Sequence, residues 1–214
     1  MLISFSGIDS SGKSTQIKLL ENFLVERGIK ARKTWGKARG TPGVVLLKKL
    51  LRRDQKYTFE EKLAYRERVL KSSIKRRLLL YASLFDLLWY FGIYYRILDL
   101  FYKITILDRY IWDTYIELKT EFTDSNFENW ILWKLVIFLS PEPRVSILIT
   151  IPPEESIRRD IQKNDLTVDS LDLKKQKLSL YEKLSQNQKW SVVINGMQPE
   201  DIIHTFILKS LKLK

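Results

Sequence analysis

The sequence predicts an α/β protein in which a parallel sheet of five strands is covered by helices on both faces. Short apolar runs alternate along the chain with longer segments of helical periodicity. The short runs are apolar at consecutive positions, as expected for strands that are buried on both sides. Because no internal repeat or long linker interrupts this alternation, we expect a single domain over residues 1–214.

The first predicted strand, residues 2–6, leads into Gly7–Ser14, which matches G-x-x-x-x-G-K-[ST] in full. Apolar residues then recur at helical spacing until Gly28, where the helix is expected to end. A glycine-rich loop between a strand and a helix turns its N–H groups around phosphate oxygens, and the helix adds its positive end. The pattern therefore predicts a phosphate-binding loop (P-loop) and the three-layer fold of P-loop NTPases.

The P-loop predicts ATP as a co-substrate and Mg²⁺ as its cofactor. Lys13 is expected to reach the β- and γ-phosphates, and the hydroxyl of Ser14 is expected to ligate Mg²⁺. The other residues expected to bind ATP are Gly7, Ile8, Asp9, Ser10, Ser11, Gly12 and Thr15.

The remaining strands are expected at 30–35, 104–107, 145–151 and 190–194. Helices are expected at 44–51, 59–74, 78–95, 111–120, 127–139, from 153 onward, 171–184 and 199–211. The carboxyl ends of parallel strands meet at one edge of a sheet, where ligands bind. Residues that follow four of the strands are therefore expected to form one crevice: Gly7–Ser14, Trp35–Arg39, Asp108–Arg109 and the segment after Ile151.

The most apolar window, 78–95, has about the length of a membrane span. Asp86 lies in its middle, and a carboxylate costs about 3 kcal/mol at a bilayer centre. Gly92 lies within a cluster of aromatic residues, which is typical of a packed helix with a bend. We therefore expect a buried helix and no membrane association.

The chain carries a net charge of +12 and contains no cysteine. The absence of cysteine excludes disulfides, thiolate metal sites and a cysteine nucleophile, and it is consistent with a cytoplasmic protein. Between Lys48 and Arg77 there are twelve basic and four acidic residues, a net +8. This excess indicates an anionic substrate, nucleic acid, an anionic membrane or simply solvated helix faces. We see no targeting segment at the N-terminus.

Asp108 and Arg109 end the third apolar strand in the order of the chain. Asp108 is a candidate for the metal shell or for orienting an acceptor, and Arg109 is a candidate phosphate clamp because a guanidinium forks onto two oxygens. Asp113 and Glu117 are expected either to line the pocket or to lie on a solvated helix face. Trp35 is interpreted as a core residue, with stacking on a ligand as the alternative.

Taken together, these motifs resemble the thymidylate kinase family of P-loop nucleoside-monophosphate kinases. The segments that carry the resemblance occur in the family's order over nearly the whole chain: Gly7–Gln16, Leu80–Ala82, Ile106–Tyr110, Pro153–Arg159 and Ile194–Glu200. The resemblance implies transfer of the ATP γ-phosphoryl group to dTMP, giving dTDP for dTTP biosynthesis. It also implies a possible homodimer through the apolar helices, and ATP and a nucleoside monophosphate as partners, without nucleic acid.

The resemblance further implies roles for individual residues. Asp9 contacts the sugar hydroxyl of the acceptor, Arg109 its phosphate, and Tyr81 stacks on its base. Arg159 is the catalytic cation of a small LID at about 158–170, with Arg158 and Lys163 as alternatives. With Lys13, Asp108 and Arg109 it completes the expected catalytic set.

Two departures from the family pattern keep the choice of acceptor open. The segment 34–41 lacks the family's Arg-Glu-Pro-Gly-Gly-Thr, so Lys37 or Arg39 takes over the acceptor phosphate. Phe85 lies near the position of an arginine that reads thymine. The alternatives are a kinase of another nucleotide or nucleoside, or a nucleotide-dependent module that binds nucleic acid or membrane.

Overall fold

The computed structural model describes residues 1–35, 73–163 and 169–212. The expected helix at 44–51 and all but the end of the one at 59–74 lie outside these residues. The chain divides into two compact units, which are described separately here. The first comprises Met1–Lys37, Ile97–Thr120 and Glu142–Lys214, and the second comprises Ala38–Arg96 and Glu121–Pro141.

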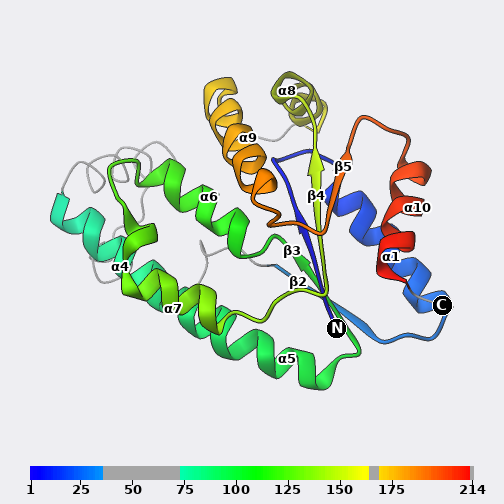
Figure 1. The fold of residues 1–214 in the computed structure, drawn as a ribbon. Helices are drawn as coiled ribbons and strands as arrows, with labels where there is room; N and C mark the ends of the chain where they lie inside the picture. Colours follow the sequence, from blue (N-terminus) through cyan, green and yellow to red (C-terminus); the bar gives the residue numbers. More distant parts are fainter. Residues whose placement is uncertain (36–72, 164–168, 213–214) are drawn as a thin grey trace, which may run out of the picture. The chain divides into compact units, whose positions relative to one another are not determined.

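The first unit is built on a five-stranded sheet in which all four strand pairings are parallel (Figure 1). The strands are β1 (Leu2–Ser6), β2 (Ala31–Trp35), β3 (Ile104–Asp108), β4 (Val145–Thr150) and β5 (Val192–Asn195). Their spatial order is β2-β3-β1-β4-β5, so β1 lies at the centre and the P-loop leaves the middle of the sheet. The predicted α/β fold with five parallel strands is confirmed.

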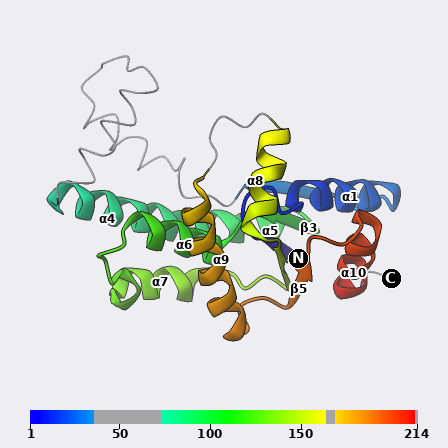
Figure 2. The same ribbon diagram turned by 90° about the horizontal axis from the view of Figure 1, so that it is seen from above.

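Helices cover both faces of this sheet. They are α1 (Lys13–Glu26), α6 (Ile111–Glu121), α8 (Pro153–Gln162), α9 (Leu171–Gln186) and α10 (Glu200–Leu211). Figure 1 shows α1 and α10 on one side of the strands and α6 and α9 on the other, and Figure 2 again shows α1 beside α10. The result is the predicted three-layer arrangement.

Alternation along β4 explains why two hydrophobic cores form. Ile147 and Ile149 face the core of α1 and α10, together with Ile17 of α1 and Ile207 of α10. The intervening Leu148 faces the second core, to which α6 and α9 contribute Ile116, Tyr181 and other residues. Successive strand residues point to opposite faces, so a run that is apolar throughout supplies both cores.

The described part of the second unit consists of helices and short helical turns. The described ones are α4 (Ser73–Trp89), the single π-helical turn Tyr90–Tyr94, the 3₁₀ turn Phe127–Asn129 and α7 (Ile131–Leu139). The expected continuous helix at 127–139 is wrong, because Trp130 has an extended backbone that separates the last two elements. α7 packs against both α4 and the π-helical turn. Gly92 permits this approach, since a Cβ there would lie 3.3 Å from Cβ of Leu139.

The apolar window at 78–95 is only half buried, so the expectation of a buried helix is wrong for one of its faces. Leu80, Leu84 and Leu87 are buried, whereas Phe85 and Trp89 are 63% and 60% exposed. Within the described residues, α4, the π-helical turn and α5 (Tyr95–Phe101) form one helix, Ile74–Phe101, long and apolar enough to cross a membrane. Length and composition alone are weak support for such a span.

Gly196 allows β5 to approach the P-loop, and we predict that enlarging it destabilises the protein. A Cβ at this position would lie 2.7 Å from Cγ2 of Ile149 and 2.8 Å from the carbonyl oxygen of Ser11. Overpacking of this kind costs about 1–3 kcal/mol. Gly196→Ala is therefore expected to lower the free energy of unfolding by that amount, measured by urea denaturation. Met197→Ala, at the exposed neighbouring position, is the control and should leave the free energy within about 0.5 kcal/mol.

Candidate functional site

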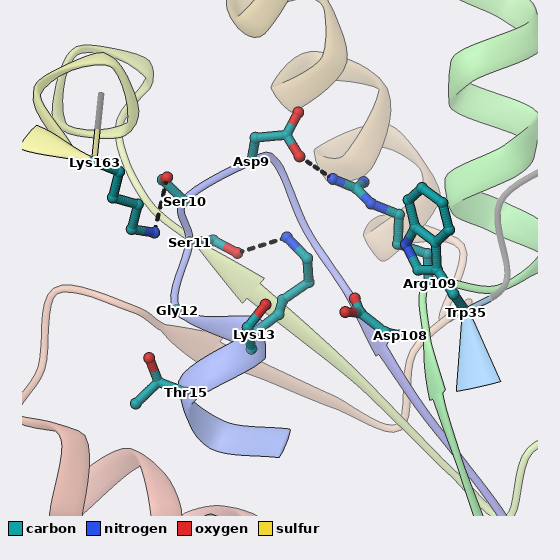
Figure 3. Close-up of a pocket in the computed structure, with 11 residues that line it drawn as sticks. Asp9, Ser10, Ser11, Gly12, Lys13, Thr15, Trp35, Asp108, Arg109 and Lys163 are labelled. Carbon is teal, nitrogen blue, oxygen red and sulfur yellow. Dashed lines mark hydrogen bonds and ion pairs between the residues drawn. The ribbon is translucent and has the colours of Figure 1, made fainter. Parts of the chain in front are cut away.

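A pocket lies at the carboxyl ends of β1, β2 and β3 (Figure 3). Its lining combines the P-loop with residues from the next two strand ends and from the end of α8. The lining residues are Asp9, Ser10, Ser11, Gly12, Lys13, Ser14, Thr15, Trp35, Asp108, Arg109 and Lys163. The predicted crevice therefore brings together most of the expected P-loop residues and both residues of the Asp108–Arg109 pair.

The conformation of the P-loop depends on a glycine at its first position. Gly7 has φ 138°, and a Cβ there would lie 2.3 Å from the carbonyl oxygen of Ile149. Gly12 precedes α1, whose first turn carries no acidic residue. The positive end of the α1 dipole therefore faces the pocket, and no carboxylate in the first turn of α1 neutralises it.

Lys13 lies against the P-loop and is 6% exposed. Its Nζ donates hydrogen bonds to the carbonyl oxygens of Gly7 (2.9 Å) and Ile8 (2.6 Å) and to Oγ of Ser11 (3.2 Å). Burial, with a smaller contribution from the nearby Arg109 cation, lowers the pKa of Lys13 to about 7, against the opposing effect of neighbouring carboxylates. The amine is thus held next to the phosphate cradle in an environment that disfavours its charge.

Arg109 is buried, and its guanidinium forms an ion pair with Asp9 and donates to the carbonyl oxygen of Gly7 at 3.2 Å. Its backbone has φ 74° and its N–H donates to the carbonyl oxygen of Phe5 at 2.8 Å, which turns the side chain toward the P-loop. Burial alone would lower the pKa of Arg109, but Tyr181 and the carboxylates around it raise the pKa above its ordinary value. Two side chains expected to hold the acceptor are therefore already in contact, as Figure 3 shows.

Asp113 is a buried hub behind the P-loop, so neither sequence expectation for it is correct: it does not line the pocket and does not lie on a solvated face. Its carboxylate accepts from Oγ of Ser6 (2.6 Å), N of Gly7 (3.3 Å), N of Tyr110 (3.0 Å) and the hydroxyl of Tyr181 (2.6 Å). The bond from N of Tyr110 caps the start of α6, because in a capping box the side chain at helix position N3 accepts from the N–H of the N-cap residue. Glu117, one turn further along α6, is also buried and lies outside the pocket lining.

Ser14 and Asp108 both line the pocket, which is what the predicted metal site requires. No group of three or more His, Cys, Asp or Glu side chains that could hold a metal occurs in the described parts of the chain. One hydroxyl and one carboxylate fit Mg²⁺, because this ion keeps several waters and takes its other ligands from substrate phosphates. The donor set therefore suits a cation that arrives with a nucleotide.

The three candidate cations of the LID differ in their contacts and in whether they line the pocket. Lys163 lines the pocket, and its Nζ donates to Oγ of Ser10 at 3.1 Å. Arg159 pairs with Glu155 at 2.7 Å and donates to the carbonyl oxygens of Ser10 and Gly196, at 3.4 and 3.2 Å. Arg158 is exposed and also pairs with Glu155. Hydrogen bonds to both arginines lower the pKa of the Glu155 carboxyl to about 2.

Trp35 is 57% exposed and lines the pocket, so its interpretation as a core residue is wrong. It ends the edge strand β2, where the chain emerges from the sheet beside Asp108. Of the other residues expected to bind the acceptor, Arg39 and Lys37 lie outside the described residues. Tyr81 and Phe85 lie on α4 of the second unit, where the Tyr81 ring stacks on Trp130 with centroids 4.6 Å apart.

Comparison with known proteins agrees with the resemblance inferred from the motifs. No family model matches the chain. A thymidylate kinase of Sulfurihydrogenibium sp. is 28% identical over 218 aligned positions, which cover 98% of this chain and 96% of that protein. A thymidylate kinase of Thermosipho melanesiensis is 61% identical over 33 residues, 15% of this chain and 17% of that protein. The predicted resemblance to the thymidylate kinases is thus confirmed over almost the whole chain and includes a short segment of high identity.

Proposed function

We propose that this protein is an ATP-dependent nucleoside-monophosphate kinase that transfers the γ-phosphoryl group to dTMP. The observation that carries the proposal is the pocket in which the P-loop, Ser14, Asp108 and Arg109 meet. Similarity to thymidylate kinases along the chain supports a nucleotide kinase and, with it, nucleotide binding and a divalent metal. The finer assignments of dTMP, Mg²⁺, dTTP biosynthesis and a cytoplasmic location follow from that similarity and form part of the proposal.

The ATP side of the site consists of Gly7–Thr15. Main-chain N–H groups of the loop and the N-terminus of α1 bind the phosphates, and Lys13 places its ammonium on the β- and γ-phosphates. Ser14 and Asp108 hold Mg²⁺, which neutralises phosphate charge and aligns the transferred group when it is bound. The contacts of Lys13 with Gly7 and Ile8 already place its Nζ at the inner wall of the loop.

Among the described residues of the first unit, Arg109 and Asp9 form the acceptor side. The resemblance to thymidylate kinases alone assigns Arg39, Tyr81 and Phe85 to the acceptor. Arg109 is fixed by Asp9 and by the turn after β3, so it presents a permanently charged fork to an acceptor phosphate. Phosphoryl transfer needs positioned phosphates and cations on the spreading negative charge more than it needs covalent chemistry. Arg159 supplies a catalytic cation in this scheme, and the position of Lys163 in the pocket supports it as a second one.

A second candidate acceptor, another nucleotide or a nucleoside, is favoured by one specific observation. Phe85 replaces the hydrogen-bonding arginine that the resemblance implies for reading thymine, and it is 63% exposed. A site without that hydrogen bond discriminates weakly between bases. The phosphate machinery would be the same for either acceptor.

We also propose that the protein forms a homodimer through the exposed face of α4. Ile74, Leu78 and Trp89 recur at helical spacing and are each more than half exposed. Large exposed apolar patches on soluble proteins generally mark interaction sites. A second copy of the same face offers the complementary apolar surface.

Purified protein with MgATP is expected to form ADP with a nucleoside monophosphate, and dTMP should give the highest kcat/KM in a panel that also contains dUMP, dCMP, dAMP, dGMP and thymidine. A preference for thymidine over dTMP would replace the monophosphate by the nucleoside as acceptor. No turnover with any member of the panel would remove the kinase proposal.

The low pKa of Lys13 allows its contact with phosphate to be tested by proton uptake. Because burial lowers this pKa to about 7, Lys13 is mostly neutral at pH 8, and nearby phosphates favour its charged form. Binding of MgADP at pH 8 is therefore expected to take up nearly one proton, measured by calorimetry in two buffers of different ionisation enthalpy. At pH 6 the amine is already charged and uptake should be small.

Lys13→Met is the control for this experiment, because it keeps an unbranched side chain of nearly the same length and removes the titrating group. It is expected to bind MgADP without proton uptake and to lose about a hundredfold or more in kcat. Binding of MgADP by the unsubstituted protein at pH 8 without proton uptake would contradict the proposed change of Lys13 from a neutral amine in the free protein to an ammonium on the phosphates.

The proposed homodimer can be tested by sedimentation velocity. A charge buried in an apolar interface is costly, so Leu78→Glu and Trp89→Glu are expected to shift the protein from dimer to monomer. Lys75→Glu changes charge at an exposed polar position of the same helix and should leave the dimer intact. A monomeric unsubstituted protein at micromolar concentration would contradict the proposal.

A further inference from the structure

We propose that Lys174 and Asp160, a buried ion pair between α9 and α8, are positioning residues that hold the P-loop at Asp9 and Ser10 for nucleotide binding. The inference rests on the proposed function, because it assumes that the loop binds a nucleotide phosphate. It concerns side chains that lie behind the loop and outside the pocket lining.

The ion pair is almost completely removed from solvent. Lys174 is 1% exposed and Asp160 is 3% exposed. Nζ of Lys174 lies 2.5 Å from Oδ2 of Asp160 and 2.6 Å from Oγ of Ser156, which is itself fully buried. Lys174 can only donate, so it fixes the direction of both hydrogen-bond chains that start from it.

Each chain ends on the P-loop. The hydroxyl of Ser156 accepts from Lys174 and donates to the carbonyl oxygen of Asp9 at 2.7 Å. The second carboxylate oxygen of Asp160 accepts from Oγ of Ser10 at 2.5 Å. Two consecutive loop residues are therefore tied to α8, one through its main chain and the other through its side chain.

Ser10 is the residue for which this support matters most. Its φ of 57° lies in the left-handed region, which costs a non-glycine residue about 1–2 kcal/mol. Its hydroxyl also accepts from Nζ of Lys163, which lines the pocket. The anchor on Asp160 thus holds both a strained turn of the phosphate cradle and one of the candidate cations.

Packing alone does not explain an ion pair at this place. Lys174 and Tyr181 are the buried residues of α9, so position 174 is a core position of this helix. A buried ion pair commonly contributes no more to stability than apolar residues of similar volume, although removing one partner is strongly destabilising. What an apolar pair would not supply is the hydrogen bond to Ser10 and the orientation of Ser156 toward Asp9.

The test replaces both charges together, so that no unpaired charge remains buried. The double variant Lys174→Met/Asp160→Leu preserves approximate volume and is expected to unfold within a few degrees of the unsubstituted protein. Its Kd for MgADP is expected to rise about tenfold, the effect of losing one or two net hydrogen bonds that organise the loop. KM for the acceptor is also expected to rise, because Ser156 holds the main chain of Asp9, which the proposed function places on the acceptor side.

The matched control is the neighbouring pair Lys175–Glu154, which also links α9 to α8 but lies at the surface, with side chains 55% and 61% exposed. Lys175→Gln/Glu154→Gln is expected to leave the Kd for MgADP unchanged.

Amide hydrogen exchange of the free protein gives a readout that needs no nucleotide. Exchange in residues 7–13 is expected to become several-fold faster in Lys174→Met/Asp160→Leu and not in the surface control. Unchanged exchange together with an unchanged Kd would overturn the positioning role and leave the kinase proposal intact. If the unsubstituted protein does not bind MgADP at all, both proposals fall.

Discussion

The arrangement of the site depends on the four hydrogen bonds accepted by the buried carboxylate of Asp113. They join the end of β1, the start of α6 and the middle of α9 at one point. The N–H of Gly7 is one of the donors, so the first turn of the P-loop is set by a residue that lies 106 positions away in the sequence. Because Tyr110 follows Arg109 directly, the same carboxylate also fixes the turn from which Arg109 extends.

Charge balance around the pocket follows from this arrangement. Lys13 and Arg109 lie close enough that the guanidinium contributes to the low pKa of the amine, while Asp9, Asp108 and Asp113 act in the opposite direction. Four ionisable groups around Arg109 raise its pKa, so Arg109 stays charged. Lys13 is therefore the residue of this pair whose charge changes with pH. A phosphate bound beside Lys13, as proposed, would favour the charged amine and so increase the positive charge of the site.

Local sequence patterns were sufficient to predict the P-loop, the five strands and the Asp108–Arg109 pair. A P-loop is encoded within eight residues, and strand ends are marked by the change from apolar to polar residues. Sequence patterns were insufficient for residues whose surroundings are formed by distant parts of the chain. Nothing in the local sequence distinguishes Asp113 from an acidic residue on a solvated helix face, because its partners Ser6 and Tyr181 lie far away in the sequence. Lys174 likewise has the local pattern of a surface lysine, and only its contact with Asp160 shows that it belongs to a buried ion pair. The interpretation of Trp35 as a core residue was wrong because it ends β2, an edge strand that is buried at none of its residues. The helix expected at 127–139 was wrong because Trp130 adopts an extended backbone, which periodicity does not reveal.

Helix α9 supports the P-loop from behind at two points. Its buried residues Lys174 and Tyr181 are seven positions apart, which is two helical turns and about 10 Å along one face. Tyr181 acts through Asp113 on Gly7, and Lys174 acts through Asp160 on Ser10. One helix face thus reaches both the first glycine and the strained middle of the cradle. Because each path is a chain of hydrogen bonds that starts from a buried side chain of α9, a displacement of α9 would disturb both points together. The fixed seven-residue spacing on one helix preserves the distance between the two supports.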